Sequence, residues 1–307
     1  MPFVPNRYRA HIALFVVNLI YGINYTVAKD VMPTYIEPLG FILIRVTGAV
    51  TLFWLVSTLF PKERIARKDY PRLILCGAFG VAANQMLFFE GLNLTTPINA
   101  AIIMTSNPVL VLIMSALLIR ERITWLKILG ILLGAMGAIM LITGDGGMDL
   151  LDNDKHLGNL LVFLNATSYA LYLVVVKPLM NSYSPITVIK WVFTFGLLMV
   201  APFGWSQLSH VEWGSMPVEI LGAVAFVVLG TTFLAYLLNT YALKTVNPSV
   251  VSIYIYLQPA LAAIFALAVG SDSLTPIMLA SAAMIFTGVY LVSRRPRRAS
   301  RREAQIE

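Results

Sequence analysis

The sequence predicts an all-α integral membrane protein with ten transmembrane helices, arranged as two inverted five-helix repeats with both termini inside. Composition, the spacing of apolar segments and an internal duplication predict this fold. Hydrophobic residues make up 58% of the 307 residues and charged residues 12%, whereas a soluble domain carries about 25% charged residues. The mean hydropathy of +0.79 also indicates a chain that lies largely in lipid.

A transmembrane helix needs roughly 20 apolar residues, and ten segments of about that length follow one another. They lie at residues 11–30, 38–60, 72–92, 96–119, 125–143, 158–178, 184–205, 216–239, 247–269 and 274–293. Proline is accepted in the first turn of a helix, and it marks the start of four segments, at Pro38, Pro71, Pro97 and Pro185. The expected order is a cytoplasmic N-terminus (1–10), a first repeat (11–143), an acidic outer loop (144–157), a second repeat (158–293) and a basic cytoplasmic tail (294–307).

The two halves share residues at a constant spacing of 151 positions. Pro97, Pro108, Thr124 and Gly137 recur in type as Pro248, Pro259, Thr275 and Gly288. Because five spans is an odd number, the second copy enters the membrane from the opposite side. Inverted repeats are typical of transporters whose substrate site lies near the midplane between the halves, so the duplication favours alternating access.

Basic residues gather on one side of the predicted membrane. With the N-terminus inside, 19 of the 22 lysines and arginines lie on the inner side, as the positive-inside rule requires. The arginines of the tail (294–302) are therefore expected to lie beside anionic lipid head groups. The expected partners are the lipid bilayer and a small-molecule substrate, with no nucleic acid.

Motifs for catalysis or cofactor binding are missing from the sequence. The three histidines, His11, His156 and His210, lie near the ends of different spans without metal-ligand spacing. There is no phosphate-binding loop and no nucleophile elbow. We therefore expect no enzyme activity, no metal and no cofactor, and any transport must be passive or driven by a gradient of ions or substrate.

Polar residues inside the apolar segments recur on single helix faces in both halves. A polar side chain at membrane depth needs a partner or a water-filled cavity, and side chains four apart share a helix face. The set predicted to line one substrate cavity is Asn24, Tyr25, Arg45, Asn84, Gln85, Ser106, Asn107, Asn165, Tyr169, Tyr236, Asn239, Tyr254 and Gln258. The alternative is that these side chains hold neighbouring helices together by hydrogen bonds.

Two matched prolines are predicted to act as hinges. Pro108 and Pro259 each lack an N–H and displace the carbonyl four residues earlier, that of Met104 or Ile255, which bends the helix. The repeat would place both bends symmetrically about the membrane midplane. The alternative is that proline is simply tolerated in membrane helices.

Arg45 is the most costly residue in the apolar segments, because a charge at the centre of a span costs on the order of 2.5–3.5 kcal/mol. Glu90 lies at a similar depth. In a functional interpretation, Arg45 attracts a substrate carboxylate and Glu90 carries protons. In a structural interpretation, the two residues form an ion pair between adjacent helices.

Short turns before the fifth and tenth segments contain Glu121 and Asp272, which are expected to cap the following helices with Thr124 and Thr275. The fifth segment also carries small residues at helical spacing, namely Gly130, Gly134 and Gly137. Such spacing lets membrane helices pack closely. It predicts either close packing within the chain or a homodimer face, so a homo-oligomer is a candidate assembly.

Several of these features resemble the EamA family of the drug/metabolite transporter superfamily. They are Leu92, Pro97, Pro108, the RERIT turn and GILLGAMGAIMLIT, with a fainter repeat in ALKTVNP, QPALAAIF, SDSLT and TGVYL. The resemblance covers nearly all of 11–293, and Arg45 in LIRVTGA resembles an arginine common in the family's second helix. The chain departs from the family at Arg120, where a glycine often precedes the acid, and at Asp272, which replaces the second glutamate.

The resemblance implies ten helices in two inverted repeats and export of small metabolites, often amino acids, from a bacterial cytoplasmic membrane. We therefore expect a secondary exporter of small polar or amphipathic metabolites, with amino acids first, working by proton antiport or facilitated diffusion. The alternatives are a carrier of nucleosides, nucleotide sugars or drugs, and a membrane scaffold or sensor that transports nothing.

Overall fold

The computed structural model describes residues 7–95, 97–143, 156–261 and 275–293. This described part is helical throughout, with short turns and no strand. Six of its helical segments are long and apolar enough to cross a membrane: Pro38–Ser57, Arg67–Leu94, Ile102–Ile119, His156–Ser182, Pro185–Ser209 and Val218–Thr245. Two shorter apolar helices accompany them, at Trp125–Met140 and Leu279–Ser293.

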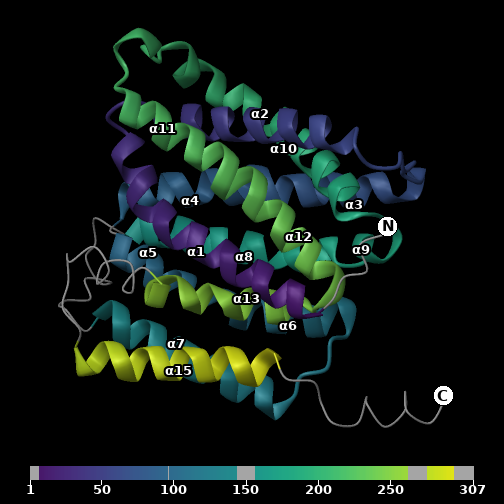
Figure 1. The fold of residues 1–307 in the computed structure, drawn as a ribbon, viewed down its shortest axis with the longest axis vertical. Helices are drawn as coiled ribbons and strands as arrows, with labels where there is room; N and C mark the ends of the chain where they lie inside the picture. The colour runs from purple at the N-terminus through teal and green to yellow at the C-terminus, as the bar shows by residue number, and fades with distance from the viewer. Residues whose placement is uncertain (1–6, 96, 144–155, 262–274, 294–307) are drawn as a thin grey trace.

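The helices lie side by side in one bundle (Figure 1). The first half contains α1 (Arg7–Val31), α2 (Pro38–Ser57), α3 (Tyr70–Gly77), η2 (Ala78–Ala82), α4 (Ala83–Leu94), α5 (Pro97–Met104), α6 (Asn107–Ile119) and α7 (Trp125–Thr143). The second half contains α8 (His156–Val176), α9 (Leu179–Ser182), α10 (Pro185–Ser209), α11 (Val218–Phe226), η5 (Val227–Leu234), α12 (Ala235–Thr245), α13 (Pro248–Ile253), η6 (Tyr254–Tyr256) and α15 (Pro276–Ser293). Short 3₁₀ turns lie at Arg67–Asp69 and Trp213–Ser215.

Helices of the first half pack mainly against helices of the second half. The main pairs are α7 with α15, α2 with α10, α4 with α8, α1 with α12, and α6 with α8; α6 also packs against α13. In Figure 1, α7 and α15 lie together at the lower end of the bundle. The core is therefore an interface between the two halves along its whole length.

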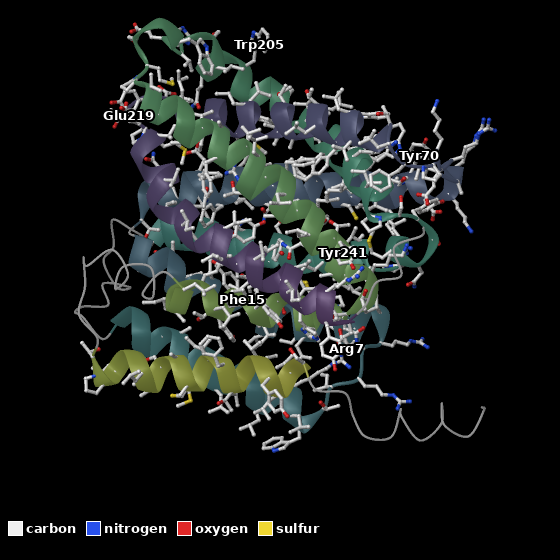
Figure 2. All side chains as sticks on the ribbon, viewed as in Figure 1. Arg7, Phe15, Tyr70, Trp205, Glu219 and Tyr241 are labelled. Carbon is white, nitrogen blue, oxygen red and sulfur yellow. The ribbon has the colours of Figure 1, made fainter. Side chains whose placement is uncertain are left out.

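The described chain begins and ends on the same side of the bundle. The guanidinium of Arg7, the first residue of α1, donates a hydrogen bond to the carbonyl of Ser293, the last residue of α15. Figure 2 shows Arg7 and Tyr70 at one end of the helices and Glu219 at the other. One end of the bundle thus carries the two described termini.

Both matched prolines lie just after real breaks in their helices. α5 ends at Met104 and α6 begins at Asn107, with Pro108 in its first turn. In the second half the helix changes to a 3₁₀ turn at Tyr254–Tyr256 and resumes before Pro259. The missing proline N–H explains why the helical hydrogen bonding stops at these places.

The two breaks contact each other across the bundle. The hydroxyl of Tyr256, within the second break, donates a hydrogen bond of 2.8 Å to the carbonyl of Thr105, within the first. Tyr256 is almost fully buried, and a buried carbonyl that has lost its helical partner needs another donor. The tyrosine supplies that donor and joins the halves at the bundle centre.

Two π-helical turns, which the sequence did not predict, lie in corresponding helices of the two halves. η2 interrupts the helix between α3 and α4, and η5 interrupts the helix between α11 and α12. The π-helix is rare, and single π turns inside α-helices are frequent at functional sites. The carbonyl of Gly80 in η2 accepts a hydrogen bond from the Tyr236 hydroxyl at 3.3 Å.

The glycines of the fifth segment are used for contact within the chain. A methyl group on Gly130 would lie 2.7 Å from the carbonyl oxygen of Gly288, and one on Gly137 would lie 2.8 Å from that of Ser281. α7 and α15 thus approach backbone to backbone, which is the close packing that such spacing permits. These glycines face α15, and an oligomer would have to use other surfaces.

The turn between α6 and α7 differs from the expected capping arrangement. The carboxylate of Glu121 forms a 2.5 Å ion pair with Lys127, while Thr124 accepts a long hydrogen bond of 3.4 Å from the Lys127 backbone N–H. Glu121 therefore neutralises a lysine, and Thr124 alone caps the helix. Asp272 lies outside the described residues.

Arg120 ends α6 with a left-handed backbone conformation, at a φ of 54°. This conformation costs a residue with a side chain about 1 kcal/mol, whereas glycine adopts it freely. We expect Arg120→Gly to raise the free energy of unfolding by about 1 kcal/mol, measured from thermal unfolding in detergent. Arg120→Ala removes the charge but keeps the strain, so an equal gain in the alanine variant would contradict this explanation.

A loop between α2 and α3 binds the start of α10. The carboxylate of Glu63 accepts hydrogen bonds from the Ser184 N–H at 2.9 Å and from its hydroxyl at 2.8 Å. Ser184 is the N-cap of α10. Partial burial raises the pKa of Glu63, but the hydrogen bonds from Ser184 and Thr187 outweigh it and hold that pKa below its usual value.

A carboxylate with a lowered pKa stabilises the fold above its unfolded pKa, which is about 4.3 for glutamate, and the effect is lost as the pH falls through the folded pKa. We therefore expect the thermal unfolding midpoint of the wild type to fall more steeply below about pH 4.3 than that of Glu63→Gln. The measurement is unfolding in detergent across a pH series. Parallel curves for the two proteins would argue against the Glu63 contact.

Candidate functional site

A cavity of about 120 Å³ lies inside the bundle. Space of this size holds several waters or one small solute. Its lining is Tyr21, Asn24, Arg45, Asn84, Gln85, Phe88, Phe89, Met104, Asn165, Tyr169, Tyr236, Ile255 and Gln258. These residues belong to α1, α2, α4, α5, α8, α12, η6 and the helical turn after η6, so both halves contribute.

Eight of the thirteen residues predicted from the sequence line this cavity: Asn24, Arg45, Asn84, Gln85, Asn165, Tyr169, Tyr236 and Gln258. Met104 and Ile255, whose carbonyls the two prolines displace, line it as well. The helix breaks thus lie at the cavity wall. The sequence analysis did not include Tyr21, Phe88 or Phe89 in the cavity set, although Tyr21 lies one helical turn before Tyr25.

The remaining predicted residues lie elsewhere. Ser106 donates to the Ile103 carbonyl at 2.7 Å, and Asn107 donates to the Ala166 carbonyl at 3.0 Å. Asn107 thus joins two helices, as the alternative predicted, whereas the Ser106 bond stays within its own span. Tyr254 contacts His11 on α1, with 2.8 Å between its hydroxyl and the ring Nδ1. Asn239 is buried in α12 without lining the cavity, and the side chain of Tyr25 is outside the described part.

Arg45 provides the one charged side chain among the lining residues. It is 5% exposed. Its Nε donates a 3.1 Å hydrogen bond to the hydroxyl of Thr232, and that hydroxyl donates in turn to the Val227 carbonyl in η5. Its guanidinium carbon lies 4.7 Å from the centre of the Phe89 ring, close enough for a cation–π interaction.

The expected ion pair between Arg45 and Glu90 is not formed. In the described part of the chain the ion pair within 4 Å is that of Lys127 with Glu121. Glu90 does not line the cavity, and the charged group that acts on it is Glu37. One terminal nitrogen of Arg45, Nη1, is buried without a hydrogen-bond partner. The arginine therefore presents an uncompensated positive charge to the cavity.

Amide side chains form the polar part of the wall. The Nδ2 of Asn165 on α8 donates a 2.6 Å hydrogen bond to the backbone carbonyl of Asn84, in the first turn after η2. Gln258 donates to Asn18 at 3.0 Å, and Asn18 donates to the Leu14 carbonyl on its own helix. A backbone carbonyl thus sets the orientation of the Asn165 amide, and another sets that of Asn18, which in turn binds Gln258. Both amide atoms of Gln85 are buried without a partner.

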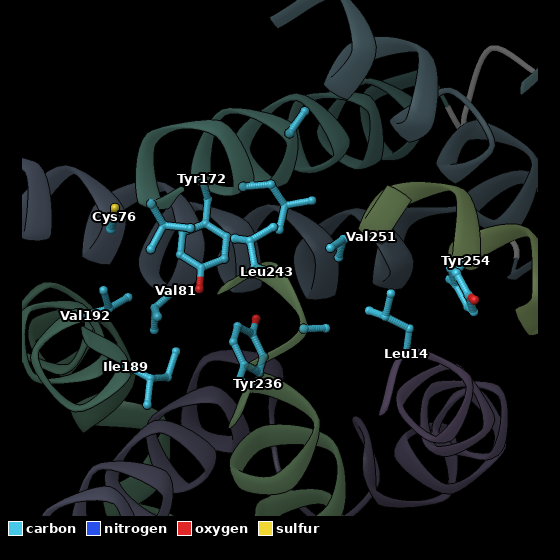
Figure 3. Close-up of a cluster of buried hydrophobic side chains, with 14 of the residues drawn as sticks. Leu14, Cys76, Val81, Tyr172, Ile189, Val192, Tyr236, Leu243, Val251 and Tyr254 are labelled. Carbon is cyan, nitrogen blue, oxygen red and sulfur yellow. The ribbon is translucent and has the colours of Figure 1, made fainter. Parts of the chain in front are cut away.

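The aromatic side of the cavity continues into the hydrophobic core. In Figure 3 the hydroxyl ends of Tyr172 and Tyr236 point toward each other within this cluster. The ring of Tyr236 packs edge-on against Phe193, with 4.9 Å between ring centres. This packing fixes the direction of Tyr236, so its ring forms a rigid wall. Within the described part of the chain, no three histidine, cysteine, aspartate or glutamate side chains gather as a metal site would require.

Comparisons with known proteins agree with a transporter. The chain is 27% identical over 249 residues to an uncharacterized transporter, YyaM, of Bacillus subtilis (strain 168), covering 80% of each chain. It is 24% identical over 260 residues to a probable terminal-alkyne amino-acid exporter of Streptantibioticus cattleyicolor, covering 83% of this chain and 84% of the relative.

A solved crystal structure shares the fold with a TM-score of 0.76 at 17% identity, covering 95% of this chain and all of the other. The model of the EamA-like transporter family matches residues 8–143 and again residues 156–294. Together with the membrane-spanning helices, these matches describe a multi-pass membrane protein. The chain belongs to the EamA-like transporter family.

Proposed function

We propose that the protein is an ATP-independent secondary transporter that exports small metabolites, with amino acids first, across a bacterial cytoplasmic membrane by alternating access. The observation that carries the proposal is the polar cavity, which is lined from both halves of the bundle at the two helix breaks. A buried polar space in a membrane protein marks the path of a solute.

The proposed architecture is two inverted five-helix repeats spanning the membrane ten times, with both termini inside. Three features support it. The family model matches twice along the chain, π-helical turns and breaks occur in corresponding helices of the two halves, and the described ends lie together. The packing is consistent with this symmetry, because corresponding helices of the two halves contact each other. These pairs are α2 with α10, α6 with α13 and α7 with α15.

In this proposal the breaks at Pro108 and Pro259 serve as hinges. Each half can bend at its own break, while the Tyr256 hydroxyl stays bound to the Thr105 carbonyl at the centre. Inverted repeats that exchange conformations open the same site to opposite sides of the membrane in turn. The described ends, where His11 meets Tyr254, would separate when the site opens on that side.

Counterflow in liposomes tests the proposal. Purified protein is reconstituted, and exchange of labelled amino acids and nucleosides is measured with and without a pH gradient. We expect exchange of amino acids, and a dependence on the gradient would indicate proton antiport over facilitated diffusion. If folded protein moves no solute in the panel, the transporter proposal fails.

Two alternatives make different predictions. A nucleotide-sugar carrier needs several cations for its phosphates, and Arg45 is the one charged side chain in the lining. A scaffold or sensor needs no water path to the cavity. Cys76, the one cysteine of the chain, can be replaced by alanine, and a reporter cysteine at Asn165, Tyr236 or Gln258 then reports whether water-soluble thiol reagents enter.

A further inference from the structure

A lysine beside a group of aromatic rings lies on the surface of the bundle, away from the cavity. Lys190 on α10 extends over the ring of Trp54 on α2, with 4.6 Å between its Nζ and the ring centre. The same Nζ donates a long hydrogen bond of 3.4 Å to the hydroxyl of Ser57, the last residue of α2. Trp54 itself is 39% exposed. These contacts hold the ammonium group where α2 meets α10.

Aromatic side chains from three helices extend this contact. Trp191 of α10 packs edge-on against Trp54, with 5.4 Å between ring centres, and Tyr70 of α3 packs edge-on against Trp191 at 5.7 Å. The indole N–H of Trp54 donates a 3.0 Å hydrogen bond to the Thr194 hydroxyl. Because tryptophan and tyrosine gather where membrane proteins meet the lipid head groups, the cluster marks that level of the bundle.

The position of Lys190 along its helix agrees with this level. Lys190 lies six residues after Ser184, the N-cap of α10, which is about 9 Å along the helix axis. A lysine at that depth keeps its carbon chain in the apolar zone and reaches back to the head groups with its ammonium group. Figure 2 shows Tyr70, a member of the same cluster, at the end of the helices that carries Arg7. The charge is thus placed level with lipid phosphates.

Cations outnumber the available carboxylates in the segment that leads to this cluster. Both acids of the segment are already engaged: Glu63 accepts hydrogen bonds from Ser184, and Asp69 accepts one from the Tyr183 hydroxyl at 2.7 Å. Among the residues that the structure describes, no carboxylate lies within 4 Å of Lys190 or of the exposed cations nearby. These cations are Lys62, Arg64, Arg67, Lys68 and Arg72. The surface therefore favours an anionic ligand.

Exposed apolar side chains on the same two helices indicate which anion fits. Leu55 follows Trp54 on α2 and is 61% exposed, and Leu198, two helical turns after Lys190 on α10, is 66% exposed. In a membrane-spanning bundle such side chains contact hydrocarbon tails. A soluble anion would gain nothing from them, whereas a phospholipid carries a phosphate and hydrocarbon in this arrangement.

We propose that the surface formed by Lys190, Ser57, Trp54, Trp191 and Tyr70 binds one anionic phospholipid, whose phosphate pairs with the Lys190 ammonium group and whose acyl chains lie along α2 and α10. A lysine binds phosphate as a point charge, and cations beside a span attract anionic lipids. A zwitterionic lipid carries the same phosphate, but the cations repel its own ammonium group. None of the five residues lines the cavity, so this site is separate from the solute path.

Thermal unfolding of the purified protein in detergent tests this site, because a bound ligand raises the unfolding midpoint. Three probes are compared: dioleoylphosphatidylglycerol, dioleoylphosphatidylcholine, and glycerol 3-phosphate, which is a soluble phosphate without tails. We expect phosphatidylglycerol to bind at least about tenfold tighter than phosphatidylcholine, since each nearby lysine or arginine strengthens the attraction of an anionic head group roughly fivefold. Glycerol 3-phosphate at the same concentration should give no shift.

Two variants with matched controls assign the binding to residues. Lys190→Gln should weaken phosphatidylglycerol binding about tenfold, whereas Arg122→Gln, which removes an exposed cation from the turn before α7, should leave it unchanged. Trp54→Leu removes the ring under the ammonium group and should weaken binding about threefold. Trp125→Leu, at a tryptophan that is 73% exposed on α7, should leave it unchanged.

Several outcomes would overturn the assignment. Equal binding of the two lipids would do so, and a shift with glycerol 3-phosphate as large as that with phosphatidylglycerol would identify a site for soluble anions instead. Equal losses in Lys190→Gln and Arg122→Gln would show attraction by the basic surface as a whole and refute a defined site. If Lys190→Gln does not fold, Trp54→Leu and its control Trp125→Leu decide the case in the same way.

Discussion

Replacing Arg45 by glutamine is expected to lower amino-acid counterflow about a hundredfold, because a hydrogen bond to a charged group contributes up to about 3 kcal/mol. Glutamine has a similar length and keeps an N–H donor, so the change removes the charge with little change of shape. Arg45→Lys restores the charge but not the planar fork that reaches Thr232 and the cavity together. We expect the lysine variant to recover only part of the transport rate.

The stability of the same variant separates a transport role from a structural one. If Arg45 held the fold through an ion pair, its loss would destabilise the protein by about 3–5 kcal/mol. Here Nη1 has no partner, so the ligand-free variant should unfold at the same temperature as the wild type or higher. Unfolding of both proteins in detergent, with and without leucine, measures this. A large fall in the ligand-free midpoint would contradict the proposed role.

The second large effect is expected at the contact between α7 and α15. Gly130→Val should destabilise the bundle by about 3 kcal/mol or more, because the new side chain would meet the Gly288 carbonyl and overpacking costs about 1–3 kcal/mol even where side chains can move. Backbone cannot move aside as a side chain does. Thermal unfolding in detergent gives the measurement.

Gly222→Val is the matched control for this prediction. Gly222 also lies within a helix, and a methyl group built on it meets no other atom within 4 Å. The two variants share the same change in helix propensity, so the difference between them reports the packing contact alone. Equal stability of the two would show that α7 and α15 do not approach as closely as described here.

Much of the site could be predicted from the sequence, because polar residues in apolar helices have few roles open to them. Asn165, Tyr169 and Tyr236 stood out for this reason, and the cavity contains all three. Pro108 indicated its break directly, since the ring removes a helical hydrogen bond wherever it occurs. Pattern and backbone chemistry were enough at these positions.

Other features depend on contacts between helices, which the amino-acid sequence alone does not reveal. Asn107 looks like a lining residue by spacing, yet it binds the Ala166 carbonyl of a neighbouring helix. Phe89 supports Arg45, but an apolar ring in an apolar span carries no signal. The partner of Glu121 proved to be Lys127, six residues later in the first turn of α7, because an available lysine competes with the helix end for a carboxylate.

The π-helical turn at Ala78–Ala82 makes this point of the span tolerant of the loss of one residue. An α-helix rotates by about 100° for each residue, but a π turn already holds one residue more than an α turn. Removing a single codon here would therefore restore regular winding and leave Asn84 and Gln85 on nearly the same face. Gene variants of this protein that lose one residue at this point should keep the solute path together with their hydrophobicity and their membrane insertion.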